Sequence, residues 1–585
     1  MNSPSPAIVA QSAVRRLPRV ALWLFCLAYV LPGFIGRDPW KNADLQGFGY
    51  MYELAKGTSR WLAPTLLGLA PEFDALLPYW LGAWAILATG PWLAPDVAVR
   101  LPYVGLLGLT LLATWHAVYQ LARRPQAQPV AFAFGGEADP RDYARALADA
   151  GLLALVACLG LAQFSHETTP SLAQLAFTAL TLYGLAALPH EPRADPYGHT
   201  ETNDTADRQL LARWLRSLAS LAIGLGGLTL SGAPTLAMLF AAGGAGVLLL
   251  QRPQDPAQRQ SYRRRALAIA LLGAAAAALA FLLQLWHWRL DAQGREWRAL
   301  GRLLVWFTWP VWPLALWTVW RWRHHLLERH LALPLWIAGV ALVGALTTPN
   351  ADRSLLLTLP ALAVLAAFAL PTLSRSVAAL IDWFTLLFFS GIALVIWVVW
   401  ISLHTGVPAK PAANVAKLAT GFEPSFSTPA FVVALAGTLA WAALVRWRVG
   451  RHRAALWKSL VLPAGGAALC WLLLMTLWLP VLDYARSYVS VVATIERAIR
   501  QQDPTPPCVE VSGLTRSQLV ALRYHGGLTL RSADPKAPAC PWLITGVDPA
   551  AGAAAAVPPQ RWQPVTTARR PTDPRDNLRL YRAVR

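Results

Sequence analysis

The stretch at Val377–Leu403 reads VAALIDWFTLLFFSGIALVIWVVWISL, and Asp382 is its single charged residue. A helix rises about 1.5 Å per residue, and the hydrocarbon core of a bilayer is about 30 Å thick. About 20 consecutive apolar residues are therefore enough to cross a membrane. This stretch exceeds that length, so it predicts a transmembrane helix.

Similar apolar stretches recur along the chain and predict thirteen transmembrane helices. The chain has 585 residues, of which 56% are hydrophobic and only 14% charged, whereas soluble domains carry about 25% charged residues. The composition therefore predicts an all-α polytopic membrane protein. The predicted spans are Arg19–Ile35, Arg100–Leu121, Leu147–Phe164, Ser171–Leu188, Leu215–Leu230, Thr235–Leu250, Ala266–Trp286, Leu303–Trp320, Leu333–Leu346, Ser354–Leu370, Val377–Leu403, Pro429–Val445 and Leu456–Leu479.

The net charge of +20 lies mostly in short loops between these stretches. Cytoplasmic loops of membrane proteins are enriched in Lys and Arg, so the excess indicates topology and not a nucleic-acid partner. Alternation from a cytoplasmic N-terminus places the basic loops inside, and the odd number of spans leaves the C-terminal end outside. The clearest basic loops lie at Arg123–Pro125, Ser261–Ala266, Arg321–His325 and Arg446–Arg453.

The chain divides into a transmembrane domain, residues 1–480, and a small outside domain, residues 481–585. Leu482–Gln502 has helical periodicity, and the short strand-like runs CVEVSG, LTLRS and PWLITGV follow it. The pattern predicts an α+β domain. Cys508 and Cys540 lie in this domain, where an extracytoplasmic location would allow them to form a disulfide.

Two outside segments are too long to be simple connectors. Gly36–Val99 contains the amphipathic stretches DLQGFGYMYELAKG at Asp44–Gly57 and LLPYWLGAWAILATG at Leu76–Gly90. The second stretch is too short to span and is expected at the membrane interface. His404–Thr428 is rich in Pro, Ala and Lys and predicts a flexible crossing. Because long ordered loops are usually functional, the first segment is the candidate for chemistry.

Acidic residues are frequent in this first segment. Asp44 and Asp74 each lie at the start of an amphipathic stretch. Acids at helix N-termini are often caps, so capping is the alternative to a catalytic role for both.

The order of residues in this segment resembles the first periplasmic loop of GT-C glycosyltransferases. The nearest resemblance is to lipid A aminoarabinose transferases and bacterial protein mannosyltransferase-like enzymes. The plan of thirteen spans with a small outside C-terminal domain is also similar to the aminoarabinose transferases. The matching parts are Trp40, Asp44, WLAPTLLG at Trp61–Gly68, FDALLPYWL at Phe73–Leu81, RLP at Arg100–Pro102 and, later, DRSLLLTLPALAVLAA at Asp352–Ala367.

The resemblance implies an integral membrane glycosyltransferase with the GT-C fold. Such an enzyme moves a sugar from a polyprenyl-phosphate donor to lipid A, another glycan or a protein, with inversion, on the periplasmic side. It implies a multi-pass protein of the bacterial inner membrane with a cytoplasmic N-terminus and a periplasmic C-terminal domain. The expected partners are membrane lipids, the lipid-linked donor and the acceptor, and we expect a monomer.

This reaction needs a carboxylate near the acceptor hydroxyl and positive charge or a metal near the leaving phosphate. The resemblance gives Asp44 the role of base. It places Arg353 before a late span, where its guanidinium suits phosphate binding; an interfacial anchor is the alternative. Arg60 and Arg298 are further phosphate-binding candidates, because the predicted topology places both in outside loops.

A divalent metal is the cofactor that the resemblance implies. Asp74 matches a metal-binding glutamate, and His287 lies in a loop that supplies a metal ligand in the aminoarabinose transferases. The alternative for His287 is a structural interfacial role. The motif SHETTP at Ser165–Pro170 places His166 and Glu167 on the same side of the membrane, either as a solvated tip or as part of the cavity lining.

The sequence also departs from the family pattern. Leu45 follows Asp44 where the family has a glutamate, and Asp74-Ala75-Leu76 replaces Glu-Lys-Pro, so the lysine expected near the lipid phosphate is missing. These departures support a second hypothesis, a non-catalytic relative or a lipid or glycan transporter or flippase. Transporters usually carry repeats and intramembrane charges, whereas this sequence has no clear repeat and almost no acidic residue in its spans.

Overall fold

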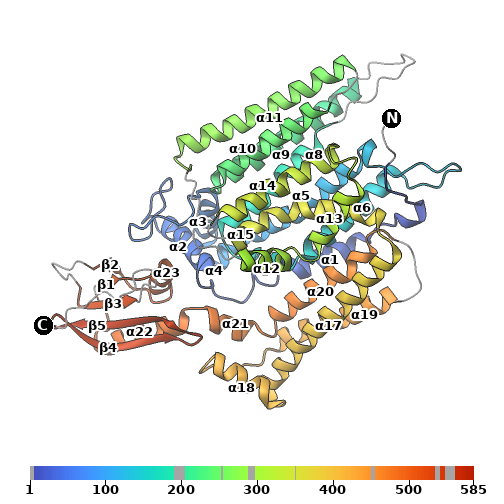
Figure 1. Ribbon diagram of the computed structural model, residues 1–585. Helices are drawn as coiled ribbons and strands as arrows, with labels where there is room; N and C mark the ends of the chain where they lie inside the picture. The colour runs from blue at the N-terminus through green and yellow to red at the C-terminus, as the bar shows by residue number, and fades with distance from the viewer. Residues whose placement is uncertain are drawn as a thin grey trace.

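The computed structural model describes nine stretches of the chain. They combine a large helical body with a small sheet domain at one end of it (Figure 1). The described residues are 5–189, 204–251, 255–286, 297–348, 351–449, 455–506, 508–533, 540–546 and 560–584.

Long helices that mostly pack side by side form the helical body (Figure 1). They are α1 (Arg19–Val30), α5 (Arg100–Ala122), α6 (Pro140–Ala157), α8 (Pro170–Ala187), α9 (Asp204–Leu230), α10 (Pro234–Leu250), α11 (Pro256–Leu282), α12 (Trp297–Phe307), α13 (Val311–Arg321), α14 (Arg329–Thr347), α16 (Leu359–Ala369), α17 (Arg375–Thr405), α19 (Thr428–Val449) and α20 (Lys458–Leu474). Shorter helices connect them: α2 (Ala43–Ala55), α3 (Leu77–Thr89), α4 (Pro95–Ala98), α7 (Leu159–Phe164), α15 (Ala351–Ser354), α18 (Ala409–Leu418) and α21 (Leu479–Arg486).

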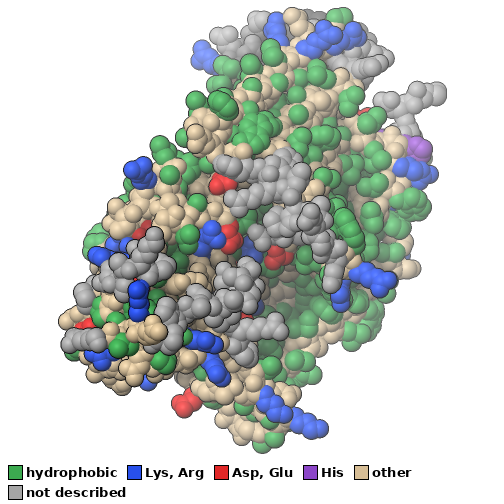
Figure 2. All heavy atoms as spheres, turned by 60° about the vertical axis from the view of Figure 1, so that its left-hand side comes forward, with side chains coloured by type: hydrophobic (Ala, Val, Ile, Leu, Met, Phe, Trp, Pro, Cys, Tyr) green, Lys and Arg blue, Asp and Glu red, His purple; other side chains and the backbone are tan. Residues whose placement is uncertain are grey.

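Each of the thirteen predicted spans coincides with a helix or a group of helices. Among the described residues, seven helices are long and apolar enough to cross a membrane, or nine if each of two bent pairs is one span. α1 and α10 are apolar but shorter, with 12 and 17 residues. Hydrophobic side chains cover much of the flank of the helical body (Figure 2). The predicted fold class, an all-α membrane protein, is confirmed. By helix length and composition alone, fewer than the thirteen predicted spans are identified.

Two predicted spans are bent. Leu303–Trp320 was expected to be one helix, but α12 and α13 meet at 87°. Pro310 lies at this break, and proline removes a backbone donor and clashes with the preceding turn. The span predicted at Leu456–Leu479 likewise ends in a 67° bend between α20 and α21, and Pro480 lies in the first turn of α21.

The predicted flexible crossing at His404–Thr428 is wrong in its central part. The sequence AKPAANVAKL forms the helix α18 there. Alanine and lysine are strong helix formers, and this preference outweighs the single proline, which lies in the first turn. The two amphipathic helices predicted in the first outside segment are present as α2 and α3.

A five-stranded sheet with the order β2-β1-β3-β5-β4 forms the core of the C-terminal domain. β1 pairs in parallel with β2 and β3, whereas β5 pairs antiparallel with β3 and β4. The elements are α22 (Val489–Gln502), β1 (Val509–Ser512), α23 (Arg516–Tyr524), β2 (Leu530–Ser532), β3 (Trp542–Gly546), β4 (Trp562–Arg570) and β5 (Asp573–Ala583). The sequence predicted α22 and the first three strands. The predicted boundary after residue 480 falls just inside α21 and stays a prediction.

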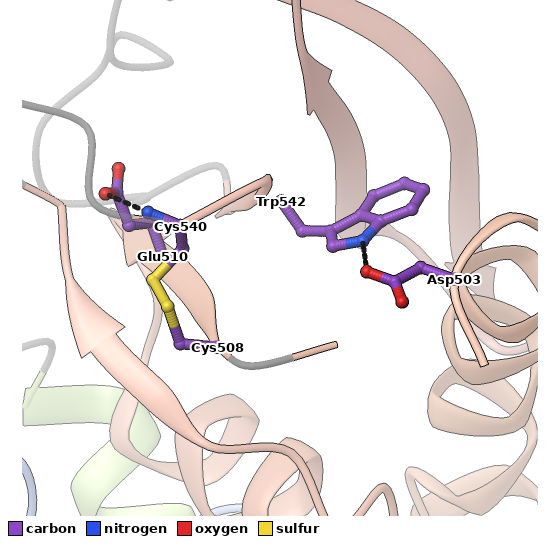
Figure 3. The surroundings of a disulfide bond; sticks show 5 residues. All are labelled: Asp503, Cys508, Glu510, Cys540 and Trp542. Carbon is purple, nitrogen blue, oxygen red and sulfur yellow. Dashed lines mark hydrogen bonds between the residues drawn. A yellow bond between two sulfur atoms is a disulfide. The ribbon is translucent and has the colours of Figure 1, made fainter. Parts of the chain in front are cut away.

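A disulfide between Cys508 and Cys540 joins the starts of β1 and β3, with 5.4 Å between the Cα atoms (Figure 3). The carboxylate of Glu510 accepts the backbone N–H of Cys540 at 3.2 Å. The Trp542 indole donates to Asp503, the residue after α22, at 3.4 Å. Together these bonds fasten the parallel strands to the helix that leads into the domain.

Replacing both Cys508 and Cys540 by serine should destabilise this domain by about 3–4 kcal/mol. The bond closes a loop with a sequence separation of 32, and chain-entropy arguments give about that loss. Limited proteolysis of the full chain in detergent measures the effect through cleavage inside residues 508–546. The matched control is Cys26→Ser in α1, which should leave that cleavage unchanged; equal protease resistance of the double variant would contradict the expectation.

The sheet domain packs on the helical body through α23 and α2. Arg523 Nε lies 2.5 Å from Glu53 Oε1, and the Glu53 side chain is 4% exposed. Tyr524 donates its hydroxyl to Asp96 at 2.8 Å. At the closest approach, a Cβ built on Gly49 would lie 2.1 Å from a methyl group of Val520.

Gly49→Val should therefore push α23 away from α2 and lower stability by about 1–3 kcal/mol, the usual cost of overpacking. Thermal unfolding of the detergent-solubilised chain measures this loss. Gly108→Ala in α5 is the control, because a Cβ built there would meet no atom of the described residues within 4 Å apart from the adjoining backbone of α5. An unchanged unfolding temperature for Gly49→Val would show that the two helices do not pack as described.

Candidate active site

Asp44 lies in the first turn of α2 with 2% of its surface exposed. Its Oδ1 accepts the backbone N–H of Thr168 at 2.7 Å and the Thr168 hydroxyl at 2.8 Å. Its Oδ2 accepts Arg37 Nη1 at 2.5 Å and the backbone N–H of Trp40 at 3.1 Å. None of these donors is an amide of α2, so Asp44 does not act as a helix cap. The carboxylate instead joins three separate segments.

Arg37 is the buried counter-charge of Asp44, and both side chains are 2% exposed. Its guanidinium also donates to the carbonyl of Gly33 at 2.5 Å and to the carbonyl of His166 at 2.7 Å. Burial raises the pKa of Asp44, but the charge of Arg37 and the hydrogen bonds from Thr168 outweigh it and lower the pKa. Asp44 is therefore held ionised.

The turn at Ser165–Thr169 between α7 and α8 is buried, with each residue at most 5% exposed. The motif is therefore not a solvated tip. Arg353 of α15 donates to Glu167 Oε2 through Nε at 3.1 Å and through Nη2 at 2.9 Å. Glu167 Oε1 has no hydrogen-bond partner among the described residues. Burial raises the pKa of Glu167, Arg353 opposes this effect and the charge of Asp44 adds to it.

Arg486 of α21 reaches this group of charges from the C-terminal part of the chain. Its guanidinium lies 4.8 Å from the centre of the Trp40 ring, and that of Arg37 lies 4.6 Å from the same centre. The Trp40 indole donates to Asp483 at 2.8 Å, which fixes the ring against α21. Arg486 interacts electrostatically with Glu167. Within the described part of the chain, its guanidinium makes no hydrogen bond or ion pair.

Three of the predicted site residues thus come together: Asp44, Glu167 and Arg353. His166 is adjacent in sequence, but its ring packs among aromatic rings, with the Trp471 ring centre 4.7 Å away. Burial lowers the pKa of His166 to about 4, so the ring is neutral at physiological pH. Its backbone, not its imidazole, contacts the site.

Arg60 and Arg298 are exposed. Neither makes a hydrogen bond or an ion pair with Asp44 or Glu167, so the structure does not place them in the buried group.

The predicted metal ligands are not brought together in the described residues. Asp74 is half-buried in the segment before α3, and His287 lies outside the described residues. No group of three His, Cys, Asp or Glu side chains in the described stretches is arranged to hold a metal ion. The implied divalent metal therefore does not fit a donor set seen here, and the Asp74 and His287 pair stays a prediction.

Sequence reasoning missed Arg37, Thr168 and Arg486. Arg37 lies directly after the first span and three residues before Trp40, and this proximity is a signal that the sequence offered. Thr168 lies inside the SHETTP motif. Arg486 is separated from Asp44 by more than 400 residues, and no local pattern marks it.

The long apolar helices and the α+β domain beside them form a membrane-protein fold that is also known from solved structures. Two solved structures share this fold. One is ArnT from Cupriavidus metallidurans in the apo state, with 16% identity, coverage of 96% of both chains and a TM-score of 0.56. The other is the same protein bound to undecaprenyl phosphate, with 14% identity, coverage of 96% of both chains and a TM-score of 0.54. No protein-family model and no curated protein matches the chain.

Removing Arg37 should strongly destabilise the chain. Arg37→Gln leaves the Asp44 charge buried without its partner, which typically costs about 3–5 kcal/mol. The loss of stability in Arg37→Gln should become smaller toward acidic pH, because a protonated Asp44 needs no counter-charge. Thermal unfolding between pH 4 and pH 8 measures it.

The double variant Arg37→Gln/Asp44→Asn supplies the control, since it removes both charges. It should lose less stability than Arg37→Gln alone. Additive losses from the two single substitutions would show that the pair is not coupled.

Proposed function

We propose that the chain is an integral membrane glycosyltransferase that moves a sugar from a polyprenyl-phosphate donor to an envelope acceptor. The observation that carries this proposal is the group of the buried Asp44 and Glu167 and the half-buried Arg353 and Arg486 at one end of the helical body. This group supplies both charge types that the transfer needs, carboxylates for the acceptor and guanidiniums for the phosphate. It lies in a fold for which a solved example, ArnT, binds undecaprenyl phosphate.

The site is proposed to face the periplasm of a bacterial inner membrane, with the N-terminus in the cytoplasm. The Cys508–Cys540 disulfide supports this orientation, because such bonds persist in oxidising compartments. The basic loops support it too, since α5 leads from Arg100, next to the site, to Arg123 and Arg124 at its other end.

In the proposed reaction the acceptor hydroxyl attacks the anomeric carbon with inversion. The bond to the carrier phosphate breaks, and the hydroxyl proton passes to a carboxylate. Asp44 was predicted as the base, but four hydrogen bonds occupy its acceptor positions and its pKa is lowered. Glu167 has a raised pKa, and its Oε1 accepts no hydrogen bond from the described residues. We therefore favour Glu167 as proton acceptor and Asp44 as the residue that positions the Thr168 turn.

Arg486 is the best candidate to bind the leaving phosphate. Its guanidinium has no carboxylate partner in the described residues, whereas Arg353 is already paired with Glu167. A guanidinium binds phosphate through paired N–H donors, and positive charge stabilises the leaving group. In this proposal Arg486 replaces the lysine that the family pattern has after the Asp74 position.

A transporter or flippase finds less support. Asp382 is the acidic residue that the sequence placed inside a span, and the structure pairs it with Arg448. A paired carboxylate in this position ties α17 to α19 and does not offer a free proton relay.

Mass spectrometry of lipid A and envelope glycans from a deletion strain tests the function. The deletion should remove a sugar that the parent strain carries, and the unchanged gene should restore it. Glu167→Gln and Arg486→Gln should fail to restore it, with transfer reduced about 100-fold or more. Glu72→Gln, at a surface acid that is 44% exposed, is the matched control and should restore it. A deletion strain with unchanged glycans would refute the proposal.

The pH dependence of kcat/KM separates the two carboxylates. Because the pKa of Glu167 is raised, the acid limb of the profile should lie above the ordinary glutamate value of about 4.5. Glu167→Gln should abolish this limb in the residual activity, whereas Asp44→Asn should lower activity and keep it. A limb that disappears in Asp44→Asn instead would restore Asp44 to the role of base.

A further inference from the structure

A second group of charges lies at the end of the helical body away from the sheet domain. Arg124 follows α5, Arg265 belongs to α11 and Arg329 begins α14, and all three guanidiniums converge on the backbone carbonyls of Leu185–Pro189 at the end of α8. Arg124 Nη2 lies 2.6 Å and 3.0 Å from two of these oxygens, and Arg265 Nη1 lies 2.5 Å from a third. Arg329 donates to the carbonyl of Leu185.

This second group is far from the Asp44 site. Arg100 at the start of α5 donates to the backbone of Arg37 beside that site, whereas Arg124 lies past the other end of the helix. The 23 residues of α5 span about 35 Å. The two groups therefore face opposite sides of the membrane.

Among the residues that the structure describes, no acid compensates the buried charges of Arg124 and Arg329. Arg124 and Arg329 are 8% and 5% exposed, and no carboxylate of the described residues pairs with either. The Arg329 Nε and both ring nitrogens of the adjacent His330 are buried and have no hydrogen-bond partner in the described part of the chain. The carbonyl end of a helix offers only about half a negative charge. Buried guanidiniums in such surroundings favour a bound anion.

A cavity of about 410 Å³ opens beside this group, between the end of α10 and the start of α11. Its wall combines apolar and cationic side chains, and Tyr262 connects it to the buried charges, because Tyr262 interacts electrostatically with Arg124 and Arg329. Lys and Arg side chains also gather at the top of Figure 2, at the height of the upper end of α11 in Figure 1. The lining residues are Leu248, Leu249, Gln251, Arg259, Tyr262 and Arg263.

We propose that this cavity binds the phosphate group of an anionic phospholipid in the leaflet opposite the Asp44 site. Arg259 and Arg263 would contact the phosphate oxygens through their N–H donors. The side chain of Leu249, which is 55% exposed, would contact the first carbons of the acyl chains, whereas Leu248 lines the cavity but is only 1% exposed. Arg124 and Arg329, which are buried, and Arg265, which is half-buried, supply the positive potential behind Tyr262. Basic pockets between membrane helices are known to hold such head groups.

Native mass spectrometry of the full chain in detergent tests this site with added phosphatidylglycerol. The wild-type chain should retain one molecule of this lipid more strongly than phosphatidylcholine with the same acyl chains. Arg259→Gln/Arg263→Gln should weaken retention at least tenfold. Arg375→Gln, at an exposed arginine that begins α17, is the matched control and should bind like the wild-type chain.

Inorganic phosphate at millimolar concentration serves as competitor. The lipid should stay bound, because Leu249 contributes contacts that free phosphate lacks; full displacement would overturn the lipid assignment in favour of free phosphate. Equal retention of phosphatidylcholine, or unchanged retention in the double variant, would also overturn it. Both substituted arginines are exposed and far from Asp44, so the double variant should keep its fold and any sugar transfer. The outcome is therefore independent of the proposed function.

Discussion

The ion pair between Arg37 and Asp44 is the interaction on which the site depends. Both charges are removed from water, so each needs the other, because an unpaired buried charge costs several kcal/mol. Through their remaining hydrogen bonds the two side chains hold the end of α1, the start of α2 and the Thr168 turn in one place. Segments separated by more than 100 residues thus meet at a single carboxylate.

The chemistry of the proposed site follows from this pair. The fixed charge of Asp44 helps to raise the pKa of Glu167, although burial contributes most. Trp40, whose amide binds Asp44, places its ring between Arg37 and Arg486 and so brings α21 to the site. The sheet domain also fixes the position of α2, because α23 packs on the end of α2 that lies away from Asp44. The two carboxylates therefore differ in environment, and such a difference separates acid, base and positioning roles.

The charged side chains at the two ends of the helical body have different kinds of partner. At the Asp44 end, the buried carboxylates Asp44 and Glu167 are paired with Arg37 and Arg353. At the other end, the guanidiniums of Arg124, Arg265 and Arg329 bind backbone carbonyls at the end of α8. The positive-inside pattern predicted basic loops on that side, but it describes composition and did not show that three of these arginines turn inward.

The sequence by itself determined the membrane class and the α+β nature of the tail, and it singled out Asp44 and the SHETTP motif as candidate site residues. These features depend on local hydrophobicity, periodicity and motif order, which each stretch carries on its own. Only the tertiary structure decided that Asp44 is saturated with hydrogen bonds, that Glu167 pairs with Arg353 and that Arg486 joins them. It also revealed β4 and β5, which are placed by their pairing with each other and with β3. Burial and long-range pairing set these features, and neither is encoded in a local pattern.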